Sequence, residues 1–569
     1  MKNWRFYTLL FFIAIFFGII IFRLFSLQVL SHAYYQKLAE NQHEIFQTIY
    51  PDRGEIFMRD RLTETDSRSS LFPAVINKDW WLIYAIPKNI EEKKEAVEKL
   101  SPLLNIEKET LEQRIGKEDD PYEPLESKVD NQTAEKIKDL EIPGIGLRTE
   151  TWRYYPAQPL ACHIIGFVGY KGDKRVGRYG IEEYYEEELA GQLGMIEAKK
   201  DSLGNLISVG GKALKEPKDG ADIILTIDPN IQFFIEKELK EAVNNLQAEG
   251  GTIIVMDTRT GAIKGMANYP TFNNNEYSEV KDINLFLNPA IHDMYEPGSI
   301  FKAITMAAGL DTSAVNPRTT YEDKGLIEIS GHKIKNSHEE AEGIQTMVQV
   351  LEKSLNTGAV FVQQKTGKKE FKEYIRKFGF NRETGIDLTG EAEGNLSNLE
   401  TNKDLEYATA AFGQGIAVTS IQMISAITAI ANNGILLKPH VAEKIIYPDG
   451  KIEEIEKEEI GRVISSDTAS RLTAMLVSVV ENGFGKKAGV SGYAVAGKTG
   501  TAQIPEKGGY SKDTIHIFGG FFPAFNSRFS LLVKIDKPQT INFASDSVAP
   551  IFGKIAKYIL NYYEISPSQ

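Results

Sequence analysis

The sequence is poor in the residues that build disulfide frameworks and metal sites. Its 569 residues include one cysteine, Cys162, and eight histidines. A single cysteine excludes both an intramolecular disulfide and a cysteine-rich metal site. No His-Glu-x-x-His motif occurs, so the sequence offers no helix-borne zinc site either.

The sequence also lacks an excess of positive charge. Its 65 lysines and arginines are outnumbered by 78 aspartates and glutamates, which gives a net charge of −13. This balance argues against nucleic acid as a general partner. A Gly-x-Ser-x-Gly motif is absent, which excludes the nucleophile elbow of a Ser-His-Asp hydrolase. The remaining composition is that of an ordinary globular protein, and the length allows two or three domains.

One long hydrophobic run stands near the N-terminus. Residues 6–22 are almost wholly apolar, and the apolar character resumes after Arg23, which is long enough for a membrane span of about 20 residues. Lys2 and Arg5 precede the run, so we expect the N-terminus in the cytoplasm and the bulk of the chain outside. A cleaved signal peptide is the alternative, but no small-x-small site closes the run. The sequence therefore predicts an uncleaved, single-pass anchor over residues 1–30.

Residues 31–215 form a mixed region with charged, proline-punctuated stretches and no catalytic cluster. Arg53, Arg153 and Glu182 stand among aromatic residues and glycines. We interpret them as a buried charge network that holds a non-catalytic module together. The polar breaker cluster at 216–220 then predicts a domain boundary.

The region beyond this boundary begins and ends with predicted strands and is helical between them. A β-hairpin is expected early, helices in the middle, and strands and a last helix at the end. The predicted elements are a strand at 223–228, a helix from Pro229, a hairpin over 251–257 and 262–267, helices within 301–434, strands at 493–502, 515–522 and 529–535, and a helix at 550–562. Distant segments would complete one antiparallel sheet, so the fold class is α+β.

Residues 295–302 place a hydroxyl nucleophile one helical turn ahead of an amine. Ser299 and Lys302 are three residues apart, and such residues share one face of a helix, with about 5–6 Å between their Cβ atoms. The amine accepts the serine proton if it is neutral, which requires burial or neighbouring cations. The preceding Pro297-Gly298 predicts a turn and then a helix, with Ser299 at a helix N-terminus that faces a developing oxyanion.

The Ser-x-x-Lys pattern alone is a weak signal. The pairs Ser278 with Lys281 and Ser330 with Lys333 match it equally well. The first pair lies in a polar loop and the second in a strand-turn segment with exposed charge, so we interpret both as solvated side chains. Only the context separates Ser299 from these two matches.

Two further motifs supply that context, because they follow Ser299 in a fixed order. They are Ser354-Leu355-Asn356 and Lys498-Thr499-Gly500-Thr501. A second Lys-Thr-Gly triplet at 365–367 follows an apolar helical run, and its glycine is typical of a helix C-cap. Lys498 instead follows residues 493–497, which are typical of a strand. The order Ser-x-x-Lys, Ser-x-Asn, Lys-Thr-Gly occurs in penicillin-binding proteins and class A β-lactamases.

Over nearly its whole length the chain resembles the class B penicillin-binding proteins, the membrane-anchored transpeptidases of bacterial cell-wall synthesis. The resemblance also rests on stretches outside the three motifs. They are 225–228 with Gln232, 268–270, 412–415 with Thr419 and Gln422, 431–434, 153–156, His163, Gly166 and 180–182. One departure occurs in the family's Arg-Gly-x-Ile-x-Asp-Arg stretch, where residues 53–56 fit but Met58 replaces the aspartate. This departure leaves the geometry of that loop open, but not the catalytic assignment.

The resemblance implies an anchor at 1–30, an elongated α+β pedestal domain of the dimerisation type at 31–215, and a transpeptidase domain at 216–569. In the transpeptidase domain, helices lie between the outer strands of an antiparallel sheet. The implied partners are peptidoglycan stem peptides, β-lactams, the cytoplasmic membrane and a glycan polymerase of the SEDS family. Neither a metal nor an organic cofactor is implied. Division and elongation enzymes share these motifs, so the biological role and the acceptor amine stay open.

The resemblance also implies a role for each residue of the acylation step. Ser299 attacks the carbonyl between the last two D-alanines of a stem peptide, and Lys302 takes its proton. Ser354 relays a proton toward the leaving amine, while Asn356 bonds the substrate amide and helps to position Lys302. The backbone N–H groups of Ser299 and Thr501 hold the oxyanion.

The Lys-Thr-Gly motif is implied in substrate binding. Lys498 supplies positive charge, and the hydroxyls of Thr499 and Thr501 join it to grip the terminal carboxylate of the substrate. Gly500 permits close approach of the backbone to the ligand.

Two other functions remain as alternatives. A β-lactamase needs an efficient deacylating base, and the one Glu-x-x-Leu-Asn match, from Glu352 to Asn356, overlaps the Ser354 motif and cannot fill both roles. An inactive scaffold of the cell-wall synthesis complex predicts decayed motifs, whereas all three are intact. A second, glycan-polymerising activity is disfavoured, because the region before residue 215 shows no paired-carboxylate signature.

Overall fold

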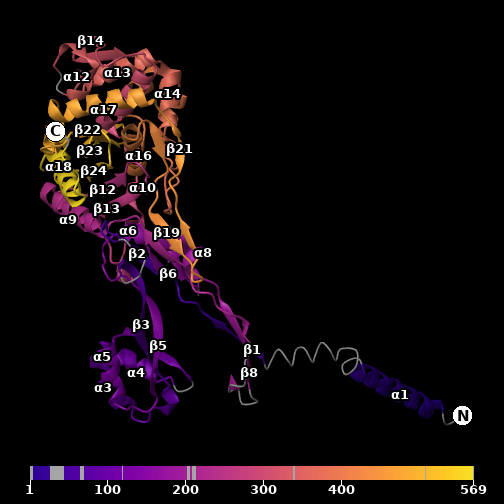
Figure 1. Ribbon diagram of the computed structural model, residues 1–569. Coiled ribbons are helices and arrows are strands. Elements are labelled where there is room, and N and C mark those ends of the chain that lie inside the picture. Colours follow the sequence, from indigo (N-terminus) through magenta and orange to yellow (C-terminus); the bar gives the residue numbers. More distant parts are fainter. Residues whose placement is uncertain are drawn as a thin grey trace. The chain divides into compact units, whose positions relative to one another are not determined.

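The computed structural model describes residues 4–25, 44–63, 70–117, 120–172, 174–200, 206–207, 213–337, 340–506 and 508–567 (Figure 1). The chain divides into two compact units. The first unit is Met1–Arg53 with Ala190–Gly220, and the second is Gly54–Leu189 with Ala221–Gln569.

The described residues of the first unit form one helix and a small antiparallel sheet. Its elements are α1 (Trp4–Phe25), β1 (Glu44–Ile49), β8 (Gly194–Lys200), β9 (Leu206–Ile207) and β10 (Ala213–Lys215). The sheet has the order β1-β8-β10, with β9 paired to β8. Of the predicted anchor over 1–30, α1 covers 4–25, and the remaining residues lie outside the described part. Among the helices of the described residues, none combines the length and the apolarity that a membrane crossing requires.

The second unit contains two large sheets, and the part built on the first of them is called the proximal part. This sheet has seven strands in the order β20-β19-β11-β2-β3-β4, and β5 pairs with β3. Its strands are β2 (Ile56–Met58), β3 (Phe72–Ala85), β4 (Glu123–Val129), β5 (Ile145–Tyr154), β11 (Asp222–Leu225), β19 (Ala442–Ile446) and β20 (Ile452–Glu454). Helices α3 (Lys93–Leu104), α4 (Lys108–Ile115) and α5 (Asn131–Lys138) pack on β3 and β4, with Leu100 and Leu111 in their common core.

Further short elements also occur in this part of the chain. They are η2 (Pro87–Asn89), α6 (Cys162–Ile165), β6 (Phe167–Lys171), β7 (Lys174–Arg178), α7 (Gly180–Tyr184) and α8 (Glu186–Ala190). Met58, where the aspartate was expected, is buried in β2 and pairs with Leu225 of β11 and Phe72 of β3. An apolar side chain suits this position, because Met58 is 1% exposed and belongs to the same core as Val75 and Leu225.

The predicted charge network is confirmed for two of its three members. Arg153 Nε donates to Glu182 Oε1 over 2.7 Å, and the two side chains are 6% and 0% exposed. Asn77 accepts from the same guanidinium, and the Tyr155 hydroxyl donates to Glu182 while it accepts from the backbone of Val168. A buried ion pair of this kind needs its additional hydrogen bonds to offset desolvation. The role predicted for Arg53 stays a prediction.

The second large sheet of this unit forms the centre of what we call the distal part. It is antiparallel and has five strands in the order β13-β12-β24-β23-β22. Its strands are β12 (Gly250–Asp257), β13 (Ile263–Tyr269), β22 (Ala496–Glu506), β23 (Gly509–Phe522) and β24 (Phe529–Asp536). The expected completion of one sheet by distant segments is therefore confirmed. Side chains alternate between its faces, because Ile253 and Val255 pack on one side and Ile254 and Met256 on the other.

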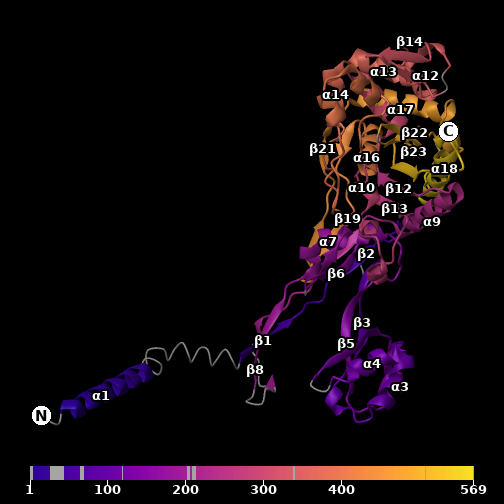
Figure 2. The same ribbon diagram turned by 180° about the vertical axis from the view of Figure 1, so that it is seen from behind.

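Helices cover both faces of this sheet (Figures 1 and 2). Helices α9 (Pro229–Leu246) and α18 (Ala544–Tyr562) pack on one face, and α16 (Ser420–Ala431) packs on the other. Asp228 caps α9 as its Oδ1 accepts from the backbone of Asn230 and Ile231, which fits proline at the next position. The prediction for α18 was wrong at its start. The helix begins six residues before Pro550, which therefore lies in its interior.

The remaining helices lie on the α16 side of the sheet or beyond it, except the short helix at Lys486–Ala488, which packs against α18. They are η3 (Asn274–Glu279), η4 (Ile283–Phe286), α10 (Pro289–His292), η5 (Gly298–Phe301), α11 (Lys302–Asp311), α12 (Met347–Glu352), α13 (Asn356–Thr366), α14 (Lys368–Lys377), η6 (Ser397–Glu400), α15 (Asp404–Ala410), α17 (Ser466–Glu481) and η7 (Lys486–Ala488). Short strands interrupt them, and of these the sequence indicated only the strand-turn segment around Ser330. They are β14 (Thr320–Asp323), β15 (Leu326–Ile329), β16 (His332–Lys335), β17 (Gly343–Thr346), β18 (Ile435–Leu437) and β21 (Glu459–Arg462).

Candidate active site

Ser299 lies in a tight turn at the start of a buried helix. The turn is the 3-10 helix η5, and α11 begins at Lys302, so the regular helix starts three residues later than expected. Gly298 has φ +59, and a Cβ there would come within 2.9 Å of the Ala502 side chain. A glycine is therefore required on both conformational and steric grounds.

Two glycines of a neighbouring loop fix this turn from outside. The Gly298 N–H donates to the Gly413 carbonyl over 3.0 Å, and a Cβ on Gly413 would lie 2.2 Å from the Gly298 oxygen. Glu296, just before the turn, accepts from the Gly415 N–H at 2.9 Å and from the Tyr510 hydroxyl at 3.1 Å. Burial raises the pKa of this carboxyl, and the two hydrogen bonds partly offset that rise.

The three sequence motifs meet at the hydroxyl of Ser354. Lys302 Nζ lies 2.5 Å from the Ser354 carbonyl oxygen and 3.2 Å from its Oγ, and Lys498 Nζ lies 3.0 Å from the same Oγ. Both lysines are 1% exposed. Ser354 has φ 54, a left-handed conformation that serine rarely adopts and that is enriched at functional sites.

The surroundings of the two lysines lower the pKa of both side-chain amines. Burial lowers the pKa of Lys302 well below its ordinary value, and the charge of Lys498 lowers it further. Burial lowers the pKa of Lys498 to about 7. Both causes act against the charged form, because a buried ammonium loses its hydration and a second cation repels it. The lowered pKa of Lys302 favours the neutral form that a proton acceptor needs.

The Lys-Thr-Gly-Thr segment lies on β22 against the nucleophile turn. A Cβ on Gly500 would come within 3.2 Å of the Ile300 backbone nitrogen, so the strand passes close to η5. Thr499 Oγ1 accepts from Lys498 Nζ at 3.3 Å, and Thr501 Oγ1 accepts from the Ala544 N–H at 3.2 Å. The first turn of α18 thus supports the end of this motif.

Asn356 lies at the start of α13 beside β16, and its role in positioning Lys302 stays a prediction. Its Nδ2 donates to the Lys335 carbonyl of β16 over 2.8 Å, whereas the Lys302 amine bonds Ser354. The reason is that Asn356 is the first residue of α13, where the strand β16 runs past the helix start. Its amide oxygen remains for another partner.

A residue that the sequence analysis missed organises this region. Asp323 is 1% exposed and accepts from Thr357 Oγ1 at 2.6 Å, from Asn336 Nδ2 at 3.0 Å and from the Glu342 N–H at 3.0 Å. Burial raises the pKa of Asp323, but these hydrogen bonds outweigh it and hold the pKa below its ordinary value. Thr357 follows Asn356, so this carboxylate holds the start of α13 in place.

The other matches to the catalytic motifs lie outside the site, in the kinds of segment that the sequence indicated. Ser278 is an exposed residue of η3, and Ser330 forms the turn between β15 and β16. Gly367 is the C-cap of α13 with φ 86, as predicted. Glu352 bonds Ser478 Oγ of α17 at 2.5 Å, so its carboxylate serves a helix contact.

The comparisons with known proteins cover most of the chain. A family model described as "Penicillin binding protein transpeptidase domain" matches residues 251–557, and one described as "Penicillin-binding Protein dimerisation domain" matches residues 48–225. The chain is 33% identical to "Stage V sporulation protein D" of Bacillus subtilis, over 97% of this chain and 85% of that protein. It is 30% identical to "Probable peptidoglycan D,D-transpeptidase PenA" of Neisseria meningitidis, over 100% and 94%.

Solved structures of penicillin-binding proteins also superpose on most of this chain. Penicillin-binding protein 3 from Mycobacterium tuberculosis, complexed with aztreonam, superposes with a TM-score of 0.70 at 25% identity, over 92% of this chain and 98% of that one. Penicillin-binding protein 2X from Streptococcus thermophilus superposes with a TM-score of 0.76 at 23% identity, over 92% and 81%. The second likeness bears on the fold alone.

Proposed function

Because this chain belongs to the class B penicillin-binding proteins and is a serine-type peptidoglycan D,D-transpeptidase, we propose that Ser299 is its acylated nucleophile. The observation that carries the proposal is the sharing of one hydroxyl, that of Ser354, by two buried lysines. Two ammonium groups so close together and so well buried favour the loss of a proton from one of them. Lys302, which directly follows the nucleophile turn, is then the base.

Acylation is a transfer of the acyl group from nitrogen to oxygen. Ser299 Oγ attacks the carbonyl between the last two D-alanines of a stem peptide, and the C–N bond to the terminal D-alanine breaks. Lys302 takes the proton of Ser299, and Ser354 passes a proton to the leaving amine. An amine of a neighbouring stem peptide then attacks the acyl carbon, Ser299 leaves with a proton, and the cross-link is complete. β-Lactams acylate the same serine.

Substrate binding is assigned to β22. Protonated Lys498 supplies positive charge to the terminal carboxylate, together with the hydroxyls of Thr499 and Thr501. Gly500 leaves room for the substrate backbone beside the nucleophile turn. The oxyanion is held by the backbone N–H groups of Ser299 and Thr501.

Asn356 binds the substrate amide through its side-chain oxygen, because its Nδ2 is engaged by Lys335. Hydrolysis of β-lactams as a main activity is not favoured. The carboxylate nearest in sequence to the Ser-x-Asn motif, that of Glu352, bonds a helix hydroxyl. The acyl-enzyme should therefore persist until an amine arrives.

Labelling with a fluorescent penicillin tests this assignment. Ser299→Ala should lose the label, whereas Ser278→Ala, which removes an exposed hydroxyl of a competing Ser-x-x-Lys match, should keep it. The wild-type adduct should last for many minutes. Labelling of Ser299→Ala at the wild-type level would refute the nucleophile, and rapid release of penicilloate would favour a β-lactamase.

We further propose that residues 1–30 are a single-pass anchor with the N-terminus inside and the catalytic domain outside. The support is the apolar run at 6–22 behind Lys2 and Arg5. A glycan polymerase of the SEDS family is the proposed membrane partner. Alkaline extraction of membranes tests the anchor, because the full chain should stay in the pellet and a chain lacking residues 1–30 should not.

The domain limits are proposed as 31–215 for the pedestal and 216–569 for the transpeptidase domain. Strand pairing continues across the proposed limit, since β11 pairs with β2 on one side and with β19 on the other. Limited proteolysis should therefore keep β2 and β11, which lie on opposite sides of the proposed limit in sequence, together in the resistant core of the second compact unit.

A further inference from the structure

Glu296 links the nucleophile turn to two segments that are distant in the sequence. Its carboxylate accepts from the Gly415 N–H at 2.9 Å and from the Tyr510 hydroxyl at 3.1 Å, and the residue is 9% exposed. These two donors are uncharged, so the link depends on hydrogen-bond geometry rather than on ion pairing. The two sides of the link differ in how firmly they are held by other contacts.

The Gly415 side is held by further hydrogen bonds. Tyr295 and Val418 exchange two backbone hydrogen bonds of 2.9 Å, and the Gly415 carbonyl accepts from Asn398 Nδ2 at 2.8 Å. Loss of the bond between Glu296 and Gly415 would therefore leave this loop in place. The loop is a fixed base to which the carboxylate is attached.

The Tyr510 side leads to the strand that carries the Lys-Thr-Gly-Thr motif. Tyr510 belongs to β23 and pairs with Pro505 of β22, three residues beyond Ala502. At Ala502 the strand already touches the nucleophile turn, because a Cβ on Gly298 would lie 2.9 Å from that side chain. The bond to Glu296 is a second contact about 10 Å further along the strand. One contact leaves a strand free to rotate about it, whereas two contacts fix its angle.

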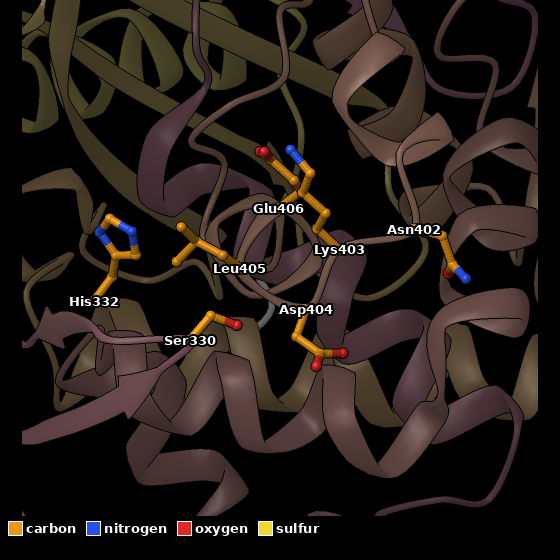
Figure 3. Close-up of a pocket in the computed structure, with 7 residues that line it drawn as sticks. All are labelled: Ser330, His332, Asn402, Lys403, Asp404, Leu405 and Glu406. Atoms are coloured by element: carbon orange, nitrogen blue, oxygen red, sulfur yellow. The ribbon is translucent and has the colours of Figure 1, made fainter.

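The Tyr510 hydroxyl is suited to donate to a carboxylate. Burial raises the pKa of Tyr510, and the charges of Glu296 and Glu406 raise it further, so the hydroxyl keeps its proton. Glu406 lies in the first turn of α15 and lines a pocket beside the β15–β16 hairpin (Figure 3). A hydrogen bond from a hydroxyl to a charged carboxylate is about twice as strong as a neutral one.

We infer that Glu296 is a positioning residue for acylation, which acts through Tyr510 to set the angle at which β22 presents Lys498 and its threonine hydroxyls to the substrate carboxylate. The inference rests on the proposed function, because it assumes that β22 binds this carboxylate while Ser299 is acylated. Glu296 acts through the strand and not on the reacting atoms. A misplacement of about 1 Å can slow a reaction on the order of 100-fold, so the angle of the strand bears on the rate.

The test compares acylation of the full-length protein by benzylpenicillin and by its methyl ester, which lacks the charged carboxylate. Intact-protein mass spectrometry follows both reactions. Wild type should prefer the acid by at least about tenfold in the second-order rate constant, the effect of one hydrogen bond to a charged group. In Tyr510→Phe this preference should fall by about three- to tenfold, because the strand is no longer aligned with the carboxylate. The midpoint of thermal unfolding should change little, since Tyr510 is 40% exposed and keeps its ring.

Substitutions of Glu296 test the other end of the contact. Glu296→Leu should reduce the preference for the acid as Tyr510→Phe does. Glu296→Gln should retain most of it, because its amide oxygen still accepts from Gly415 and its NH2 group reaches the Tyr510 oxygen. Tyr447→Phe is a matched control, since the Tyr447 hydroxyl also donates to a carboxylate, that of Glu453 at 3.3 Å, but in the proximal sheet. It should behave as wild type.

Three results would overturn the positioning role and leave Ser299 untouched. They are an unchanged preference in Tyr510→Phe, equal slowing of acid and ester, which would mean that the contact supports the fold alone, and no preference in wild type. Peptide mapping of the wild-type adduct separates this inference from the proposed function. An adduct on Ser299 supports the nucleophile whichever way the preference moves, whereas an adduct on another residue would overturn both.

Discussion

Replacing Asp323 by asparagine is expected to weaken both the fold and the acylation rate. The side chain keeps its shape but loses its charge, and its new NH2 group faces a donor. Asp323 accepts from Thr357, Asn336 and the Glu342 backbone within 3.0 Å, so at least one buried donor loses its acceptor. A hydrogen bond to a charged group contributes about 1.5–3 kcal/mol, and an unpaired buried group costs about 1–3 kcal/mol.

We therefore expect the free energy of unfolding of the transpeptidase domain to fall by roughly 2–4 kcal/mol. Differential scanning calorimetry should show a midpoint lower by a few degrees. Because Thr357 adjoins Asn356, penicillin acylation measured by stopped-flow fluorescence well below the new midpoint should slow by about tenfold or more. Asp311→Asn is a matched control, since Asp311 also accepts several hydrogen bonds but at the far end of α11. It should lose stability and keep the acylation rate.

The reasoning would be refuted by an Asp323→Asn protein whose midpoint and acylation rate both equal those of wild type. A stable protein with slow acylation would still support the positioning role. Equal slowing in both variants would mean that acylation follows overall stability rather than the start of α13.

Three further predictions follow from the contacts around the site. Acylation should have a bell-shaped pH profile in pre-steady-state labelling. The rate should rise as Lys302 loses its proton, at a pH well below the ordinary lysine pKa, and should fall as the pH rises through about 7, where Lys498 loses its proton. A flat profile from pH 6 to 9 would contradict this. Gly413→Ala, with a Cβ 2.2 Å from a backbone oxygen, should slow labelling far more than Gly390→Ala, which has a similar φ but open space. Glu182→Gln should cost about 3–5 kcal/mol of stability in denaturant titrations, because it leaves a buried arginine unpaired, while labelling of the folded protein persists; an unchanged midpoint would count against the buried network.

The sequence predicted the chemistry of the site better than its scaffold. Lys302, Ser354 and Lys498 were expected to share one site because the three motifs follow one another in a fixed order, and their side chains meet in the structure. The role of Ser299 as the nucleophile stays a proposal. Asp323 was missed because a lone aspartate in a polar stretch carries no such pattern. Its importance comes entirely from donors that tertiary structure brings together.

Predictions from local sequence patterns were also wrong where tertiary packing determines the bounds of a helix or strand. Proline usually marks a helix start, so the last helix was predicted to begin at Pro550. Ala544, Val548 and Ala549 are buried against the central sheet, and this packing extends the helix past the proline. The four-residue strands β14 and β17 were missed for a similar reason, since each is too short to show a period. The partner of Asn356 depends on where β16 runs and has no local signal at all.

The seven-stranded sheet has a consequence for the order in which the protein assembles. Its neighbouring strands β2, β11 and β19 come from residues 56–58, 222–225 and 442–446. A chain synthesised from its N-terminus makes β2 and β11 long before β19 exists, so the edge of β11 stays open through more than a third of synthesis. Unpaired edges of this kind recruit other strands. Release of the nascent chain before β19 emerges should therefore yield an aggregation-prone fragment, and a binding protein that covers the β11 edge would be needed most during that interval.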